Sequence, residues 1–422
     1  MSDTTEQIGV LGQINVVKAE IVSSTGKAID ITGLIGDLTL YEDLFSNTMS
    51  GHLILQDSLD LINSLPLIGQ EILNIELQTP TLTNKIVKTF YIYKLQNRIV
   101  KKRSQVYMLN FCSIELINSE NSKISKAFSG NISDTVSSIF KDVKYINSSS
   151  TLYVDKTKNS YQFIAPFWTP LETINWLTAK SLNEHGVANY LFFETNQSFE
   201  FVSVDFLIKQ VPVRDYVYSD VDPNTAFGIN GSKDDKYSLV ESMDNGVTFD
   251  YLRNLNAGMY SSKLYTFDLT TRNINTTTFD YIDDFGKSSH LEKEPLRTDS
   301  LFRKKLASLY FIHKNNYQTG TYKQQGYKDF FLQRNSLLEQ LSAFKICIKV
   351  LGRTDIKVGS TITFTVPELR QILKDEIETS GKSDYFTGKY LITAIKHQIV
   401  NGNHSMYMEI ISDSFIKNLI TK

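Results

Sequence analysis

The groups in this sequence that come nearest to a chemical motif are two glycine–lysine–serine triplets, which begin at Gly286 and Gly381. A loop that surrounds phosphate with backbone amides also needs a glycine five residues before the triplet. Those two positions hold Tyr281 and Glu376. We therefore expect no nucleotide-phosphate site at either triplet.

Metal ligands are equally sparse. No two histidines lie at the spacing of a helical zinc site, and Cys112 and Cys347 are too few and too far apart for a zinc cluster. We interpret both cysteines as buried apolar side chains in a reducing compartment. A segment that starts at Asp220 opens like a calcium loop, but its sixth position holds Thr225 where a glycine is required. We predict no metal and no cofactor, and structural or surface roles for the six histidines: His52, His185, His290, His313, His397 and His404.

A catalytic assignment finds little support either. The sequence contains no G-x-S-x-G segment, which is the hydrolase nucleophile signature. Any two of the 46 acidic residues could form a carboxylate pair in the fold, so a hydrolase stays an alternative. We predict that the protein is not an enzyme and that it has no catalytic residues.

The elements that position these residues are mainly strands. With 422 residues the chain is too long for one ordinary core, and its 25 Phe and 22 Tyr favour sheets. The net charge of −2 gives no reason to expect a nucleic-acid surface. No apolar run is long enough for a membrane-spanning segment, and the acidic N-terminus does not resemble a secretory signal.

Periodicity divides the chain into a strand-rich start, a mixed middle and a strand-rich end. Short alternating runs over residues 1–128 predict a barrel or a sandwich. Residues 129–210 predict a small α+β unit, in which Thr169, Pro170 and Glu172 combine a capping box with a proline at the first helical position. Ser133 or Asp134 is expected to cap its first helix, which should bury apolar residues at helical spacing. Those residues are Ile132, Val136, Ile139, Phe140 and Val143.

Two further helices and a hairpin are predicted in the last third. Helical spacing joins Phe302, Leu306 and Leu309, and again Leu337, Leu341 and Phe344. Asn401-Gly402 lies between two alternating runs, which is the strongest hairpin signal.

A turn between two glycines leads into one very regular strand near the C-terminus. Gly352, Ile356 and Gly359 form the pattern G-x-x-x-[ILV]-x-x-G, and the glycines are expected to permit the backbone geometry of a barrel turn. After the turn Ile362, Phe364 and Val366 alternate with threonines, which predicts a strand with one face in a barrel core.

Three segments resemble the central baseplate hub protein of contractile-tailed phages of the T-even type, in the same order and at similar separations. They are residues 38–80, residues 163–204, and the turn of residues 352–359 with the helix before it and the hairpin after it. The same turn leads into a barrel strand in related spike-bearing proteins of contractile injection systems. Residues 256–327 show little resemblance to the family.

The resemblance implies a strand-rich α+β fold with two similar antiparallel β-barrels. The first would span 1–128, and the second 211–262 with 343–413. The α+β unit of 129–210 would lie between them, with a peripheral domain of 263–342 and 414–422.

The family's function is mechanical. The resemblance implies a homotrimer in a virion tail baseplate, assembled in the host bacterial cytoplasm, whose barrels form a pseudo-sixfold ring. The ring would adapt a hexameric tail tube to a trimeric central spike, contact neighbouring wedge proteins, and let phage DNA pass without specific binding. The alternatives are a β-rich glycan-binding tail protein, with exposed aromatic residues on one sheet face, and a tail-associated cell-wall hydrolase.

Overall fold

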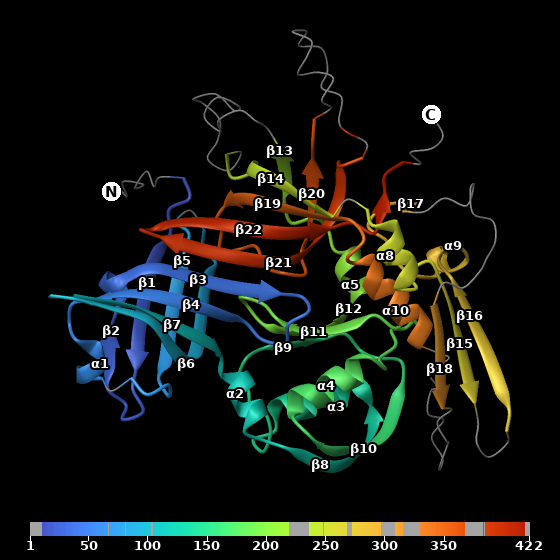
Figure 1. The fold of residues 1–422 in the computed structure, drawn as a ribbon, viewed down its shortest axis with the longest axis horizontal. Coiled ribbons are helices and arrows are strands. Elements are labelled where there is room, and N and C mark those ends of the chain that lie inside the picture. Colours follow the sequence, from blue (N-terminus) through green and yellow to red (C-terminus); the bar gives the residue numbers. More distant parts are fainter. Residues whose placement is uncertain are drawn as a thin grey trace, which may run out of the picture.

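The computed structural model describes residues 11–65, 67–80, 82–102, 104–218, 236–247, 249–267, 272–296, 309–314, 330–367, 383 and 385–417. A sheet of thirteen strands runs through the molecule, with a small unit of strands and helices below it and a three-stranded sheet at one side (Figure 1). None of the helices in the described part of the chain is long and apolar enough to cross a membrane. The calcium-like segment at Asp220 lies outside the described residues, and so do Gly381 and Lys382 of the second triplet.

The first seven strands form a strongly curved antiparallel half of the large sheet, in the order β2-β1-β5-β6-β7-β4-β3. Its elements are β1 (Asn15–Val22), β2 (Ala28–Asp30), η1 (Thr32–Leu34), β3 (Ile35–Asp43), β4 (Ser50–Asp57), α1 (Leu61–Ser64), β5 (Ile72–Gln78), β6 (Lys85–Lys101) and β7 (Ser104–Ser113). Alternate residues such as Leu53 and Leu55 are fully buried inside the curve, as the period of a strand requires. No ladder joins β1 to β3 within the described residues, so this half is a barrel with an open side.

A unit of four helices and short sheets follows, packed around its own core. Its elements are α2 (Ile114–Glu120), β8 (Ile124–Asn131), α3 (Ile132–Lys141), β9 (Leu152–Val154), β10 (Ser160–Trp168), α4 (Pro170–Thr178), β11 (Tyr190–Glu194), β12 (Phe199–Ser203) and α5 (Val204–Lys209). The capping box of Thr169 and Glu172 is confirmed. The predicted cap of α3, Ser133 or Asp134, was wrong, because the Asn131 side chain accepts from the Ser133 amide and caps the helix. Val143 lies beyond the helix end and is exposed.

The remaining six strands of the large sheet close into a barrel. They are β13 (Asp215–Tyr218), β14 (Leu239–Val247), β19 (Lys345–Leu351), β20 (Thr361–Thr365), β21 (Gly388–Val400) and β22 (Asn403–Ile411), and pairing of β21 with β22 completes the ring. The expected purely antiparallel barrel was wrong in one strand, since the short β13 runs parallel to both β14 and β20. The hairpin at Asn401-Gly402 is confirmed, and both turn residues have positive φ, at 50° and 78°.

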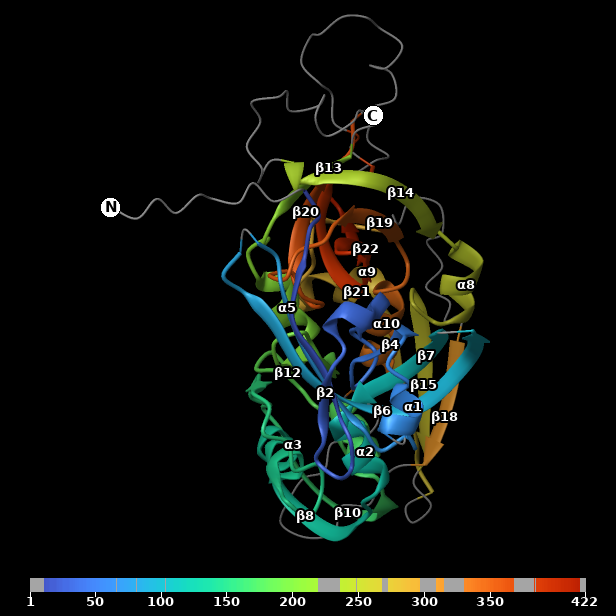
Figure 2. The same cartoon turned by 90° about the vertical axis from the view of Figure 1, so that its left-hand side faces the viewer.

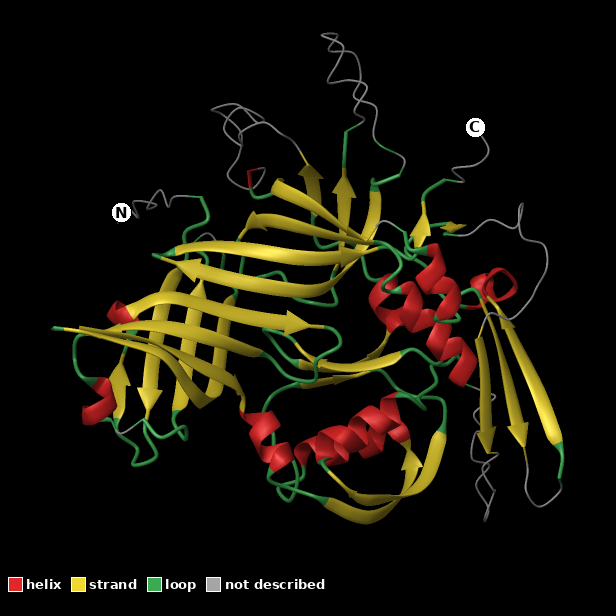
Figure 3. Ribbon diagram, in the orientation of Figure 1, coloured by secondary structure: helices red, strands yellow, loops and turns green. Residues whose placement is uncertain are grey.

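A peripheral group of helices and a three-stranded sheet lies beside the second barrel (Figure 3). Its elements are α8 (Tyr251–Asn256), β15 (Ser261–Phe267), β16 (Ile274–Asp280), α9 (Tyr281–Asp284), η2 (Phe285–Lys287), β17 (Glu294–Pro295), β18 (Leu309–Lys314), α10 (Phe331–Gln340) and β23 (Ser414–Phe415). The helix predicted to include Leu309 was wrong at that residue, because Leu309 begins β18. Phe302 and Leu306 lie outside the described residues. The helix predicted near Leu337 exists as α10, but it buries Leu332, Ser336 and Gln340.

The two halves of the large sheet repeat one strand order. The order β3-β4-β7-β6-β5 corresponds to β14-β19-β22-β21-β20, with the same directions and the same order along the chain. One irregularity recurs as well. The ladder of β6 with β7 shifts between Ile92 and Lys94, and that of β21 with β22 shifts between Ile392 and Ala394. A second shift in β6, between Gln96 and Ile99, has no counterpart in β21. Because a bulge is a specific local structure, its recurrence fixes which residues of the two halves are equivalent.

Candidate functional site at the junction of the two barrels

The two barrels are joined by a seam of backbone hydrogen bonds between β3 and β21. The strands are antiparallel, from Asp37 opposite Val400 to Asp43 opposite Ala394. Figure 1 shows these strands side by side across the middle of the molecule, and Figure 2, turned by 90°, shows β21 above β4 of the first barrel. The seam turns two barrels into one continuous sheet, so neither can rotate against the other without breaking a ladder.

A buried polar network crosses this seam. The His397 ring donates through Nε2 to Glu42 Oε1 at 2.9 Å, and its Nδ1 lies 3.1 Å from His404 Nε2. Burial and the nearby His397 ring hold the pKa of His404 well below its ordinary value. A neutral His404 with its hydrogen on Nε2 donates to His397 Nδ1, since the His404 Nδ1 atom has no hydrogen-bond partner. The network therefore fixes the orientation of both rings at the junction.

Gly352 lies against the His404 ring, and this contact gives it a different role from the one expected. A Cβ atom at position 352 would lie 1.9 Å from His404 Cγ, whereas the glycine's φ is outside the left-handed region. Close approach of a buried side chain, rather than backbone freedom, thus requires glycine here. The Gly352 amide also donates to the His404 carbonyl at 2.8 Å.

The rest of the turn from Gly352 to Gly359 contacts both other parts of the molecule. The Thr354 hydroxyl donates to the Asn84 carbonyl of the first barrel at 2.7 Å. The Asn196 side chain of the α+β unit donates to the Ile356 carbonyl at 2.8 Å, and Lys357 forms an ion pair with Glu200. The turn therefore ties the second barrel to its two neighbours.

Gly359 ends the turn in the left-handed region, with φ of +80°, and its amide donates to the Ile392 carbonyl at 2.9 Å. The strand that follows places Ile362, Phe364 and Val366 in the core of the second barrel, where the first two are fully buried. The six residues singled out from the sequence thus lie in one turn and the strand after it. Their contacts are with the barrel core and with the neighbouring parts of the chain.

A second buried carboxylate links the first barrel to the α+β unit. Glu194 Oε1 pairs with Lys88 at 2.7 Å, and its Oε2 accepts the Met49 amide at 2.8 Å and the Ser113 hydroxyl. Burial raises the pKa of Glu194, and the Lys88 charge opposes that change. This arrangement neutralises an otherwise costly buried charge, and no local pattern in the sequence marks it.

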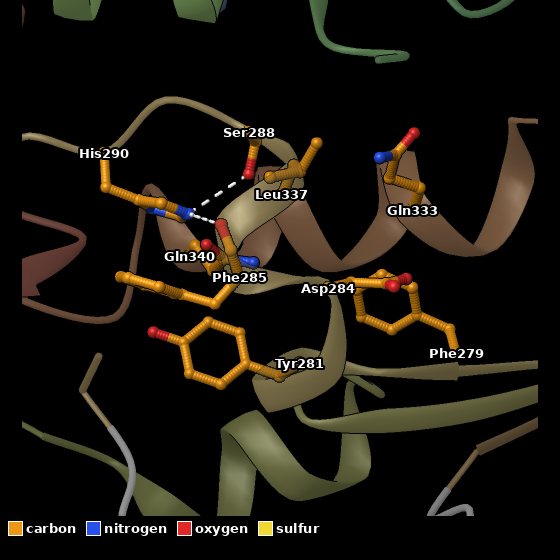
Figure 4. Close-up of a pocket in the computed structure, with 9 residues that line it drawn as sticks. All are labelled: Phe279, Tyr281, Asp284, Phe285, Ser288, His290, Gln333, Leu337 and Gln340. Carbon is orange, nitrogen blue, oxygen red and sulfur yellow. Dashed lines mark hydrogen bonds between the residues drawn. The ribbon is translucent and has the colours of Figure 1, made fainter. Parts of the chain in front are cut away.

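Side chains that commonly bind metals are scattered over the described residues. Within them no group of three or more His, Cys, Asp or Glu side chains could hold a metal ion. The pocket in Figure 4 lies in the peripheral part, where His290 contacts Ser288 and the Phe285 carbonyl. Its cavity of about 10 Å³ is close to the minimum for one water molecule. Burial alone would lower the pKa of His290, but its hydrogen bond to Asp413 raises it.

The two cysteines differ from each other. Cys112 is buried, and burial raises the pKa of its thiol to about 11. Cys347 is exposed, so its expected burial was wrong. It lies on the outward face of β19, opposite Asp244 of β14.

The structure is similar to solved tail proteins at low sequence identity. A tail protein from Neisseria meningitidis MC58 matches with a TM-score of 0.55 and 11% identity, covering 94% of this chain and 96% of that one. The 43 kDa tail protein of prophage MuSo2 from Shewanella oneidensis matches with a TM-score of 0.57, 8% identity, and 94% and 99% coverage. A prophage tail protein from Listeria monocytogenes EGD-e matches at 0.52, with 8% identity and 96% of both chains. No family model matches the sequence, and no curated protein matches it significantly. The chain thus has the fold of these tail proteins, as the resemblance led us to expect.

Proposed function

We propose that the chain is a non-enzymatic hub protein of a phage-type tail baseplate. Three copies would form a ring that adapts a hexameric tail tube to a trimeric spike and contacts neighbouring wedge proteins. DNA would pass through the ring without specific binding. The observation that carries the proposal is the repetition of one strand order and one bulge in two barrels of the same chain.

Symmetry explains why such a repetition is useful. Two equivalent barrels in each of three subunits offer six similar surfaces to a sixfold partner, while the differing parts of the chain keep threefold symmetry for the spike. The rigid seam and the turn of residues 352–359 suit a protein that transmits force. We assign the two barrels to 1–128 and to 211–262 with 343–413. The α+β unit would be 129–210, and the peripheral domain 263–342 with 414–422. Side chains of α2 and β8 also pack into the core of the α+β unit, and side chains of α8 pack into the peripheral core.

The fold of the similar tail proteins supports a place in the virion tail, with assembly in the host bacterial cytoplasm. The glycan-binding alternative is not favoured, because the exposed aromatic residues of the described chain are spread over several elements. They include Tyr93 on β6, Tyr153 on β9, Phe167 on β10 and Tyr310 on β18.

Light scattering of the purified chain over a range of concentrations tests the proposal. We expect a species with three times the mass of the chain, because an obligate contact of this kind buries well over roughly 2,000 Å². A chain that remains a monomer at every concentration contradicts it. So does peptidoglycan hydrolysis that disappears when one carboxylate is replaced by its amide.

A further inference from the structure

Two strands in opposite halves of the large sheet each have a stretch of edge with no strand partner among the described residues. β5 pairs with β6 only as far as Ile72 opposite Tyr91, so β6 continues to Lys101 with β7 alone. β13 pairs with β14 only at Leu239 and Val240, so β14 continues with β19 alone. In the part of the chain that the structure describes, no other strand pairs with β6 after Tyr91 or with β14 after Val240.

The internal repeat indicates what these edges are for. Within the chain, β3 pairs with the part of β21 that extends beyond β20, from Ala394 to Val400. The counterpart of β21 is β6, and the counterpart of β3 is β14. Each of the two seam strands thus has an equivalent in the other barrel. Among the described residues, neither equivalent has a strand paired to the edge that corresponds to the seam.

We propose that β14 of one copy pairs with β6 of the next copy, as an intermolecular repeat of the β3–β21 seam. The strands would be antiparallel, with Lys101 opposite Ser242, Val100 opposite Met243 and Ile99 opposite Asp244. This register follows from the ladders counted along β7 and β22, because the second shift in the β6–β7 ladder, between Gln96 and Ile99, adds one residue to β6. Ser104, the partner of Lys101, is then equivalent to Asn403, the partner of Val400, and Ser242 is equivalent to Asp37. The inference rests on the proposed trimer and states how its subunits are joined.

The surface of β6 supports a protein partner. No residue from Tyr93 to Lys101 is buried, and the neighbouring residues Ile99 and Val100 are 60% and 67% exposed. Exposed apolar residues on both faces of a strand with a free edge would favour aggregation unless another strand covers them. β-strand addition is the usual way to satisfy such an edge.

Charge favours β14 as that partner. The free part of β6 carries Lys94, Arg98 and Lys101, whereas β14 carries Asp244, together with Glu241, which pairs with Lys349 of β19 at 2.8 Å. The seam within the chain has the same polarity, since Asp37 and Glu42 lie on β3 and Lys396 lies on β21.

A contact between two different edges is heterologous, so it propagates from copy to copy until the ring closes. Three copies would then join their six barrels through alternating intrachain and interchain seams. The long β6–β7 hairpin, which projects at the left of Figure 1, would be the arm that reaches the next copy.

Cysteine pairs test the register in the full chain. In a Cys347→Ser background, which removes the exposed native thiol, we would combine Lys101→Cys with Ser242→Cys and oxidise the protein. Both positions are exposed within the chain, so folding should be unaffected. The matched control is Asp37→Cys with Val400→Cys, the equivalent pair of the internal seam. An off-register pair, Lys101→Cys with Asp244→Cys, controls for random collision.

We expect the Lys101/Ser242 pair to give covalent dimers and trimers on non-reducing gels, the internal control to give cross-linked monomers, and the off-register pair to give little product. If light scattering finds the trimer, and the internal control oxidises but the Lys101/Ser242 pair does not, the strand pairing is wrong while the proposed function stands. A chain that is monomeric at all concentrations refutes both.

A second variant tests the contact without a cross-link. Val100→Asp should leave the far-ultraviolet circular dichroism spectrum unchanged and abolish the trimer, because it places a carboxylate in the intermolecular seam. Val143→Asp, at an exposed site in the α+β unit, should retain the trimer. Equal trimer formation by the two variants overturns the pairing.

Discussion

Replacing Gly352 by alanine should be among the most damaging single-methyl additions in this protein. The added Cβ would lie 1.9 Å from Cγ and 2.2 Å from Nδ1 of His404. That is about 1.5 Å closer than an ordinary van der Waals contact allows. The His404 ring cannot swing aside at low cost, because it is buried and hydrogen-bonded to His397.

The size of the effect follows from what must give way. Overpacking a core costs about 1–3 kcal/mol, and loss of the His404–His397 hydrogen bond adds about 1 kcal/mol. We therefore expect Gly352→Ala to lower the free energy of unfolding by about 2–4 kcal/mol. Gly33→Ala should change it by less than about 0.5 kcal/mol, because nothing lies within 4 Å of its Cβ and its φ is ordinary.

Urea unfolding followed by tryptophan fluorescence measures both variants, and a double-mutant cycle identifies the cause. His404→Ala removes the ring, so adding Gly352→Ala in that background should cost less than about 1 kcal/mol. If the cost of Gly352→Ala is the same with and without the His404 ring, the close approach is not the reason for glycine at this position.

Three further predictions concern the same junction and its pH dependence. Gly359→Val should lower the free energy of unfolding by about 1–3 kcal/mol, since position 359 has a φ of +80° and its Cβ would lie 3.1 Å from the Phe193 ring. A variant as stable as the wild type would rule out backbone strain at position 359. Phe364→Asp should lower the free energy of unfolding by more than about 4 kcal/mol, because it buries an unpaired carboxylate. Thr363→Asp, on the other face of β20, should lower it much less. Equal decreases for the two variants in the same urea assay would refute the burial argument. The pKa of His404 is lowered in the folded state, so its contribution to stability is present above an unfolded-state pKa of about 6.5 and is lost as the pH falls below it. Between pH 6.5 and 5.5 the wild type should therefore lose about 1 kcal/mol more than His404→Gln; equal losses would show that His404 does not take up the proton on unfolding.

Local elements of this fold could be predicted because their determinants lie within a few residues. Thr169 and Glu172 are three apart, and Asn401-Gly402 sets the pairing of its own hairpin. That hairpin register also contained an unused signal. A two-residue turn places residue 399 opposite residue 404, so His397 and His404 must share one face of the sheet.

The junction itself could not be predicted in the same way. Glu42 meets His397 across most of the chain length, and nothing near either residue indicates the other. Gly352 could be singled out by its spacing to Gly359, but the reason for glycine is a ring on another strand. The outward position of Cys347 likewise depends on which face of β19 lies inside the barrel, and composition does not determine that.

The order in which the strands of the large sheet appear along the chain has a consequence for biosynthesis. The first barrel is complete once β7 has been made, but β21, which covers the edge of β3, is among the last elements to leave the ribosome. Non-local pairings of this kind form slowly, and an uncovered strand edge can pair with other chains in the meantime. During synthesis, β3 of each nascent chain therefore has a free edge until the second barrel forms. Neighbouring chains on one polysome would be the nearest source of a wrong partner.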